Sequence, residues 1–116
     1  MVDRKIVKSI RNYLKVLKEN GIPVSYAVLF GSYVKGRQHE WSDIDLLVVS
    51  PLYDKRRSFK QMSKLWRIAA HTDSRIEPIP VGEKQYKEDD SSMIIEIARR
   101  EGTIIPFVDV LKKGGA

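Results

Sequence analysis

Two short motifs, separated by ten residues, carry the side chains best suited to chemistry. Gly31 and Ser32 follow an apolar, strand-like segment, and Asp43 and Asp45 stand at the start of another. Since residues i and i+2 of a strand share one face, the two carboxylates are expected to lie side by side. Two such like charges repel unless a cation lies between them, and carboxylate oxygens suit Mg²⁺ or Mn²⁺. The second motif therefore predicts a divalent metal site.

The first motif predicts a phosphate site beside that metal. A glycine lets the backbone approach a ligand closely, and exposed N–H groups together with the Ser32 hydroxyl can bind phosphate oxygens. Lys35 and Arg37 lie in the intervening loop, where each is either a charge partner for a phosphate or a solvated cation. Singly, a Gly-Ser pair can be a plain turn and a D-x-D pair can be a cap. Together they favour a nucleotide–metal site, which serves phosphoryl or nucleotidyl transfer.

Helical and strand-like patterns surround these motifs. Apolar positions after Asp3 recur at helical spacing, which predicts a first helix that Asn20 and Gly21 end. The further expected elements are strands over 24–30, 43–49, 75–81 and 103–108 and helices over 56–71 and 91–101. The apolar run of the second strand indicates burial on both faces, and two prolines confine the third strand to an edge or give it an early end. This order predicts an α/β (α+β) class, with a small mixed β-sheet flanked by helices.

Apolar stripes define the expected inner faces of the two longer helices. In the first helix the stripe consists of Ile6, Ile10, Tyr13, Leu14 and Leu17. In the second helix it consists of Phe59, Met62, Leu65, Trp66 and Ala69. Such stripes at three- and four-residue spacing are typical of helices that pack on a sheet.

Composition limits the class of protein. The chain has 116 residues, 42% hydrophobic and 31% charged, which predicts one domain over residues 1–111 and a flexible tail at 112–116. The absence of cysteine excludes disulfide scaffolds, thiolate metal sites and thiol catalysis. Apolar runs are too short for a bilayer span or a signal peptide, so the expected location is cytoplasmic, without a membrane. A net charge of +6 favours an anionic partner and leaves nucleic acid binding open.

Residues 30–36 and 42–48 resemble the signature of a known enzyme family. Their sequences, FGSYVKG and SDIDLLV, are similar to those of the minimal nucleotidyltransferases (MNT) of the DNA polymerase β-like superfamily. The spacing of the two motifs resembles that of the MNT antitoxins that are paired with HEPN-domain toxin ribonucleases. This resemblance extends over most of the chain and implies a nucleotidyltransferase-like fold. It also implies that Gly31 and Ser32 hold the triphosphate of ATP.

The same resemblance implies the roles of the acidic residues. Asp43 and Asp45 would bind two divalent ions, Mg²⁺ or Mn²⁺, and a third acid on the next strand would help deprotonate the attacking hydroxyl. Glu77 is the best match for that third acid, although its position depends on strand register and a solvent-facing glutamate is the alternative. Asp73, in the turn before that strand, is the fallback.

An activity follows from the resemblance as an expectation. MNT antitoxins transfer AMP from ATP to a tyrosine of the HEPN toxin and silence it, which makes a HEPN-domain protein the expected partner. One alternative is a non-catalytic nucleotide-binding antitoxin that neutralises its partner by complex formation. Another is the same chemistry on a small-molecule or RNA acceptor, for which such a short chain has little room for an added acceptor-binding domain. An exposed sheet edge near 103–108 leaves homo-oligomerisation open.

Overall fold

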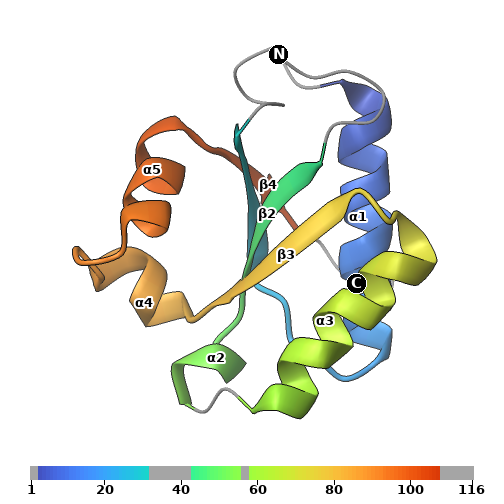
Figure 1. Ribbon diagram of the computed structural model, residues 1–116, viewed down its shortest axis with the longest axis horizontal. Helices are drawn as coiled ribbons and strands as arrows, with labels where there is room; N and C mark the ends of the chain where they lie inside the picture. Colours follow the sequence, from blue (N-terminus) through green and yellow to red (C-terminus); the bar gives the residue numbers. More distant parts are fainter. Residues whose placement is uncertain (1–2, 32–42, 56–57, 108–116) are drawn as a thin grey trace, which may run out of the picture.

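A four-stranded mixed β-sheet forms the centre of the fold (Figure 1). The computed structural model describes residues 3–31, 43–55 and 58–107. The strands are β1 (Tyr26–Phe30), β2 (Ile44–Val49), β3 (Ile76–Val81) and β4 (Thr103–Pro106), in the spatial order β3-β2-β1-β4. β1 is antiparallel to β2 and β4, whereas β3 is parallel to β2. The predicted mixed sheet flanked by helices is confirmed, and so is the edge position of β3, the strand with two prolines.

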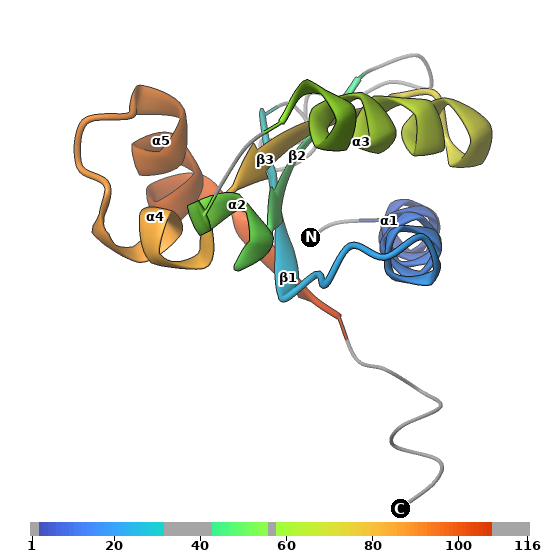
Figure 2. The same ribbon diagram turned by 90° about the horizontal axis from the view of Figure 1, so that it is seen from below.

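Helices cover both faces of this sheet. The helices are α1 (Arg4–Glu19), α2 (Leu52–Lys55), α3 (Phe59–Thr72), α4 (Glu83–Glu88) and α5 (Met93–Glu101). Figure 2 shows α1 and α3 on one side of the sheet and α4 and α5 on the other. Alternate residues of β2 enter the two hydrophobic cores: Leu46 and Val48 pack on the α1–α3 side, Leu47 and Val49 on the α4–α5 side. The predicted burial of β2 on both faces is therefore confirmed.

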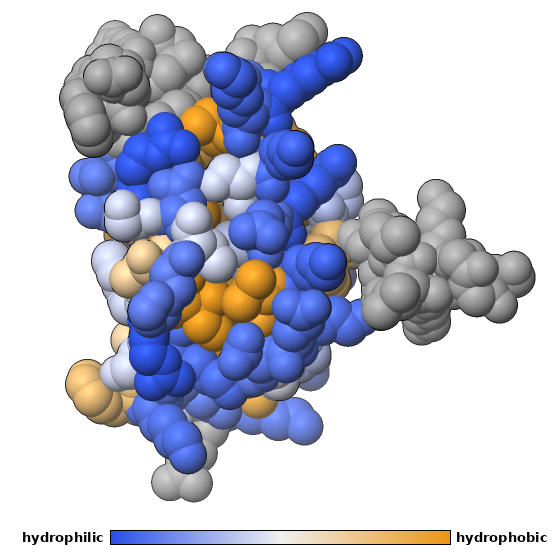
Figure 3. All heavy atoms as spheres, turned by 90° about the vertical axis from the view of Figure 1, so that its right-hand side faces the viewer, coloured by the Kyte–Doolittle hydropathy of each residue, from blue (hydrophilic) through white to orange (hydrophobic). Residues whose placement is uncertain are grey.

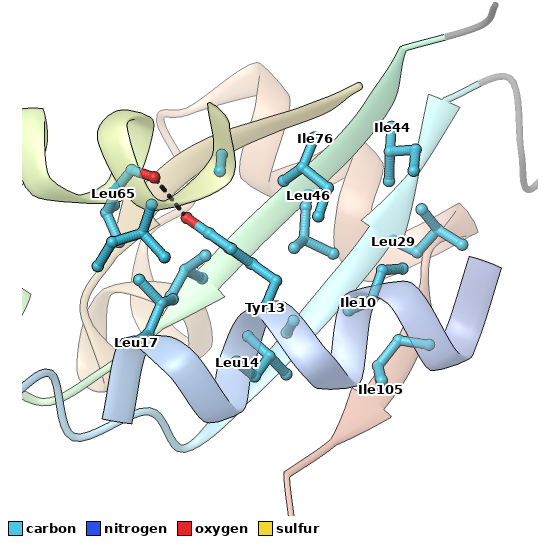
Figure 4. Packing of buried hydrophobic residues seen from close by; sticks show 14 of the residues in the cluster. Ile10, Tyr13, Leu14, Leu17, Leu29, Ile44, Leu46, Leu65, Ile76 and Ile105 are labelled. Carbon is cyan, nitrogen blue, oxygen red and sulfur yellow. Dashed lines mark hydrogen bonds between the residues drawn. The ribbon is translucent and has the colours of Figure 1, made fainter. Parts of the chain in front are cut away.

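The first helix follows its sequence pattern closely. The Asp3 side chain caps α1 by accepting a hydrogen bond from the Lys5 backbone N–H (2.8 Å). All five residues of the predicted stripe are buried. Burial raises the pKa of Tyr13, and its hydroxyl donates a hydrogen bond to the Leu65 carbonyl of α3 (2.9 Å; Figure 4). This bond joins the two helices that lie on one face of the sheet.

The stripe predicted for α3 is correct only in part. Leu65 and Ala69 are buried together with Ile68, but three predicted inner residues lie at the surface: the exposed fractions are 86% for Phe59, 51% for Trp66 and 38% for Met62. Apolar character alone does not decide which side of a broad stripe faces the core, and here contacts with α1 and β3 select the side centred on Leu65 and Ile68.

Two short helices, α2 and α4, were not predicted. Both lie beyond the carboxyl ends of β2 and β3, and a single side chain joins them. The Asp54 carboxylate of α2 accepts hydrogen bonds from the backbone N–H groups of Lys84 and Gln85 in the first turn of α4 (3.0 and 3.1 Å). A Cβ atom at Gly82 would collide with this carboxylate, so the glycine leaves room for the cap.

Replacing Asp54 by Ala is expected to destabilise the protein by about 1 kcal/mol, because two N–H groups at the start of α4 lose their acceptor. In a chain of this length the melting temperature would fall by roughly 3–6 °C, measured by thermal unfolding followed by circular dichroism. Asp90→Ala, which removes the same charge from an exposed position, is the matched control. Equal melting temperatures for the two variants would contradict the capping role.

Within residues 3–31, 43–55 and 58–107, no helix is long and apolar enough to cross a membrane. β4 ends at Pro106, two residues before the predicted end of that strand, and it forms the second edge of the sheet. The predicted tail at 112–116 lies outside the described residues.

Candidate active site

Three acidic side chains meet where β2 and β3 begin, at the upper end of the sheet in Figure 1. Asp43 immediately precedes β2, and Asp45 is the second residue of that strand. Because β2 and β3 are parallel, Asp45 pairs directly with Glu77, the second residue of β3. The Ile44 N–H donates to the Arg75 carbonyl (2.7 Å), and this bond fixes the register from which the pairing follows. The structure thus places Glu77 beside the two aspartates.

The electrostatics of these acids show that they interact. Burial raises the pKa of Asp45, as does the negative charge of Asp43, although a hydrogen bond with Glu77 acts in the opposite direction. Burial likewise raises the pKa of Glu77, and the charges of Asp43 and Asp45 raise it further. The three carboxylates therefore repel one another in the absence of a counter-charge, and a cation between them would relieve that repulsion.

The donor set fits a hard divalent cation. Carboxylate oxygens are the preferred ligands of Mg²⁺ and Mn²⁺, and three of them lie within interaction range. In the part of the chain that the structure describes, no group of three carboxylate, imidazole or thiol side chains already has coordination geometry. Small rotations of these carboxylate side chains would convert neighbours into ligands. The strand register fixes the backbone positions of Asp45 and Glu77 side by side.

The fallback acid, Asp73, has different partners. Its carboxylate accepts two hydrogen bonds from the Arg75 guanidinium (3.0 and 2.7 Å) and one from the Ser9 hydroxyl of α1 (2.6 Å). The Arg75 guanidinium is the main reason why the pKa of Asp73 falls to about 2. Asp73 therefore stabilises the turn between α3 and β3, and Glu77 is the acid that lies beside Asp43 and Asp45.

Stability at acid pH is expected to depend on Asp73. Because its pKa is lower in the folded state than the ordinary value of 3.8, it stabilises the fold above about pH 4, and this contribution disappears as the pH falls towards 2. A pKa lowered from 3.8 to about 2 corresponds to about 2.4 kcal/mol, and solvent screening reduces the expected contribution to about 1 kcal/mol. The measurement is urea unfolding of the wild type and Asp73→Asn between pH 6 and 2. A difference in unfolding free energy that stays constant with pH would contradict this account.

Gly31 directly follows β1 and lies beside this acid cluster. Its φ of +81° lies in the left-handed region that side chains other than glycine rarely adopt. A Cβ atom at this position would also collide with the Asp45 carboxylate. From the sequence we expected the backbone at Gly31 to approach a ligand. The structure shows that this backbone also lies close to the Asp45 carboxylate, a contact that no local sequence pattern reveals.

The rest of the predicted phosphate site cannot be placed in the same way. Ser32, Lys35 and Arg37 lie outside the described residues. Of the nucleotide-binding candidates, Gly31 alone is therefore located by the structure, and the roles of the other three stay predictions.

Comparison with known proteins gives a family match over most of the chain and several structural matches. Residues 10–104 match the family described as nucleotidyltransferase domain, whereas no curated protein is significantly similar in sequence. Among solved structures, a protein from Sulfolobus solfataricus described as a nucleotidyltransferase has a TM-score of 0.63 at 16% identity, over 90% of this chain and 86% of that one. A toxin–antitoxin complex with AMP-PNP has a TM-score of 0.57 at 22% identity, over 89% and 77%. A MntA-HpeT toxin–antitoxin variant has a TM-score of 0.56 at 19% identity, over 88% and 76%.

Proposed function

Because the chain belongs to the nucleotidyltransferase domain family, we propose that it transfers AMP from ATP, with Mg²⁺ or Mn²⁺, to a tyrosine hydroxyl of a HEPN-domain toxin and thereby acts as an antitoxin. Family membership confirms the resemblance to nucleotidyltransferases inferred from the two motifs, and it makes the chain a transferase. The nucleotide, the metal and the acceptor are the parts that the proposal adds.

One observation carries the proposal: the pairing of Asp45 with Glu77, next to Asp43 and under Gly31. Asp43, Asp45 and Glu77 would hold the two divalent ions, which when bound neutralise phosphate charge and position the α-phosphate. Glu77 would also accept the proton of the attacking hydroxyl. Gly31 presents backbone without a side chain, so that a phosphate can approach close to Asp45.

The reaction balances without a further reagent. The acceptor hydroxyl oxygen forms a bond to the α-phosphorus of ATP, the bond from that phosphorus to the β-phosphate oxygen breaks, and pyrophosphate leaves. The hydroxyl proton passes to the Glu77 carboxylate and from there to solvent.

One finding supports a toxin as the acceptor, and a second supports ATP as the donor. Two of the similar solved structures are toxin–antitoxin assemblies, and one of them holds AMP-PNP, an ATP analogue. The net charge of +6 further favours anionic ligands such as ATP.

The test is incubation of the purified protein with α-labelled ATP, Mg²⁺ and a lysate of the source cell. The expected result is one labelled protein band that is absent with the Asp43→Asn/Asp45→Asn double variant. Label on RNA or on small molecules would keep the chemistry and overturn the protein acceptor.

Turnover separates catalysis from plain binding. A catalytic protein inactivates many toxin molecules per copy and needs ATP to do so. Neutralisation at a ratio of one to one, unaffected by ATP, would instead support a nucleotide-binding antitoxin that acts by complex formation.

A further inference from the structure

The outer face of α3 carries an unusual set of exposed side chains. Phe59, Met62 and Trp66 stand at positions i, i+3 and i+7, which places them along one side of the helix. Phe59 is almost fully exposed, and about half of Trp66 is in contact with solvent. Large apolar groups gathered in this way are characteristic of interaction surfaces, unlike single exposed residues.

A basic row runs beside this apolar strip. Lys60 and Arg67 are exposed along one flank, and Lys64 lies in the same row, with its ammonium group donating to the Asn20 carbonyl. α3 contains no acidic residue. Figure 3 shows the side of the molecule where α1 and α3 lie, with patches of hydrophobic surface among hydrophilic side chains. The charge of this face therefore complements an acidic partner.

The position of α3 links this face to the acid cluster. Only residues 73–75 separate the end of α3 from β3, whose second residue is Glu77. The carboxyl-terminal end of α3 consequently lies at the same end of the sheet as Asp43 and Asp45 (Figure 1). A partner that lies along α3 can extend past this end of the helix towards the site of transfer.

We propose that the outer face of α3, defined as Phe59, Met62 and Trp66 with the flanking Lys60 and Arg67, docks a helix of the acceptor protein whose apolar side chains are bordered by acidic ones. This inference rests on the proposed function for the identity of the partner. Docking there would supply affinity for the acceptor, whereas the acids at the end of the sheet perform the transfer.

A protein helix fits this face better than single-stranded RNA does. The two aromatic rings are seven residues apart, which is about 10 Å along a helix, and Met62 lies between them. Single-strand binders stack successive bases on aromatic side chains within a basic groove. A helix ridge with an aliphatic residue between its aromatic groups instead matches the i, i+3, i+7 contacts of helix–helix recognition.

The test uses the labelling reaction with two altered proteins, Phe59→Ala/Trp66→Ala and Lys60→Glu/Arg67→Glu. The control is Met93→Ala/Ile94→Ala, which truncates large exposed apolar side chains on α5, at the opposite face of the sheet. Once the labelled acceptor has been purified, kcat and KM are measured against acceptor and against ATP. We expect KM for the acceptor to rise at least about 10-fold in both α3 variants, with kcat and KM for ATP nearly unchanged. The control should behave as the wild type.

The outcomes separate the two proposals. If the wild type labels a protein and the α3 variants have the same KM for the acceptor as the wild type, the proposed docking face is wrong and the proposed function stands. An equal effect of the α5 control would also overturn the docking face, and so would label that appears on RNA and depends on Trp66. If the wild type labels no protein, the acceptor itself is wrong and both proposals fall. Circular dichroism of each variant verifies that these surface changes leave the fold intact.

Discussion

Replacing Asp45 by Asn is expected to lower nucleotide transfer by roughly 10²–10³-fold, the usual effect of removing one charge-stabilising group from an active site. Asp45 occupies the centre of the acid cluster, opposite Glu77 in the parallel ladder and below Gly31. Asn keeps the shape of the side chain but removes the negative charge that would hold the cation. The measurement is the initial rate of AMP transfer to the purified acceptor at saturating ATP.

The stability of the same variant is expected to change in the opposite direction. In metal-free protein at neutral pH, Asp45 is a partly buried charge repelled by Asp43, and both effects disfavour its ionised form. A neutral Asn removes that penalty, so the free energy of unfolding of Asp45→Asn should be higher than that of the wild type by roughly 0.5–2 kcal/mol. The variant should therefore unfold at a higher denaturant concentration. Added Mg²⁺ should stabilise the wild type and leave the variant unchanged.

Asp54→Asn is the matched control, since it changes an acid at the opposite end of β2. It should retain full transfer activity and gain no stability. A variant at Asp45 that loses stability as well as activity would indicate that the carboxylate supports the fold, and the account of a repulsive acid cluster would then be wrong.

Local sequence patterns correctly predicted the buried residues of those helices and strands in which the spacing of apolar residues alone marks the buried side. The stripe of α1 and the double burial of β2 follow from spacing alone, because each element faces the core along its whole length. α4 could not be found in this way. Its first turn is capped by Asp54, which lies in another helix, so its formation depends on a contact between segments about thirty residues apart.

In the candidate site too, some residues could be placed from local sequence and others could not. Asp43 and Asp45 could be paired from sequence because i and i+2 of one strand share a face. Glu77 could be matched only through a family resemblance, since its position beside Asp45 depends on the register of a parallel strand pair. The exposed face of α3 could not be predicted at all. Phe59 and Trp66 are of residue types that are common in protein cores. Only the packing of α3 against α1 and β3 shows that these two side chains point away from the core.

Gly31→Ala is the second variant for which we expect a large effect, because the substitution introduces two separate faults. The first is the backbone, whose φ of +81° costs a residue with a Cβ atom about 1–2 kcal/mol. The second is the collision of that Cβ atom with the Asp45 carboxylate, which must move or push β1 away from β2. A shift of about 1 Å in a catalytic group lowers rates by roughly 10²-fold.

Gly21→Ala separates these two faults. Gly21 also has a positive φ, of +90°, but no atom lies within 4 Å of the place where its Cβ would stand. It should therefore show the backbone cost alone, with normal transfer activity. The extra destabilisation and the loss of activity in Gly31→Ala then measure the contact with Asp45, by urea unfolding and by the rate of AMP transfer.

A double-mutant cycle with Asp45→Ala completes the argument. Shortening Asp45 removes the atoms that the new Cβ would meet, so Gly31→Ala in the Asp45→Ala background should cost no more stability than Gly21→Ala does in the wild type. If the cost of Gly31→Ala stays the same in both backgrounds, the strain lies in the backbone only. Gly31 would then serve the turn at the end of β1 and not the position of the Asp45 carboxylate, on which the proposed chemistry depends.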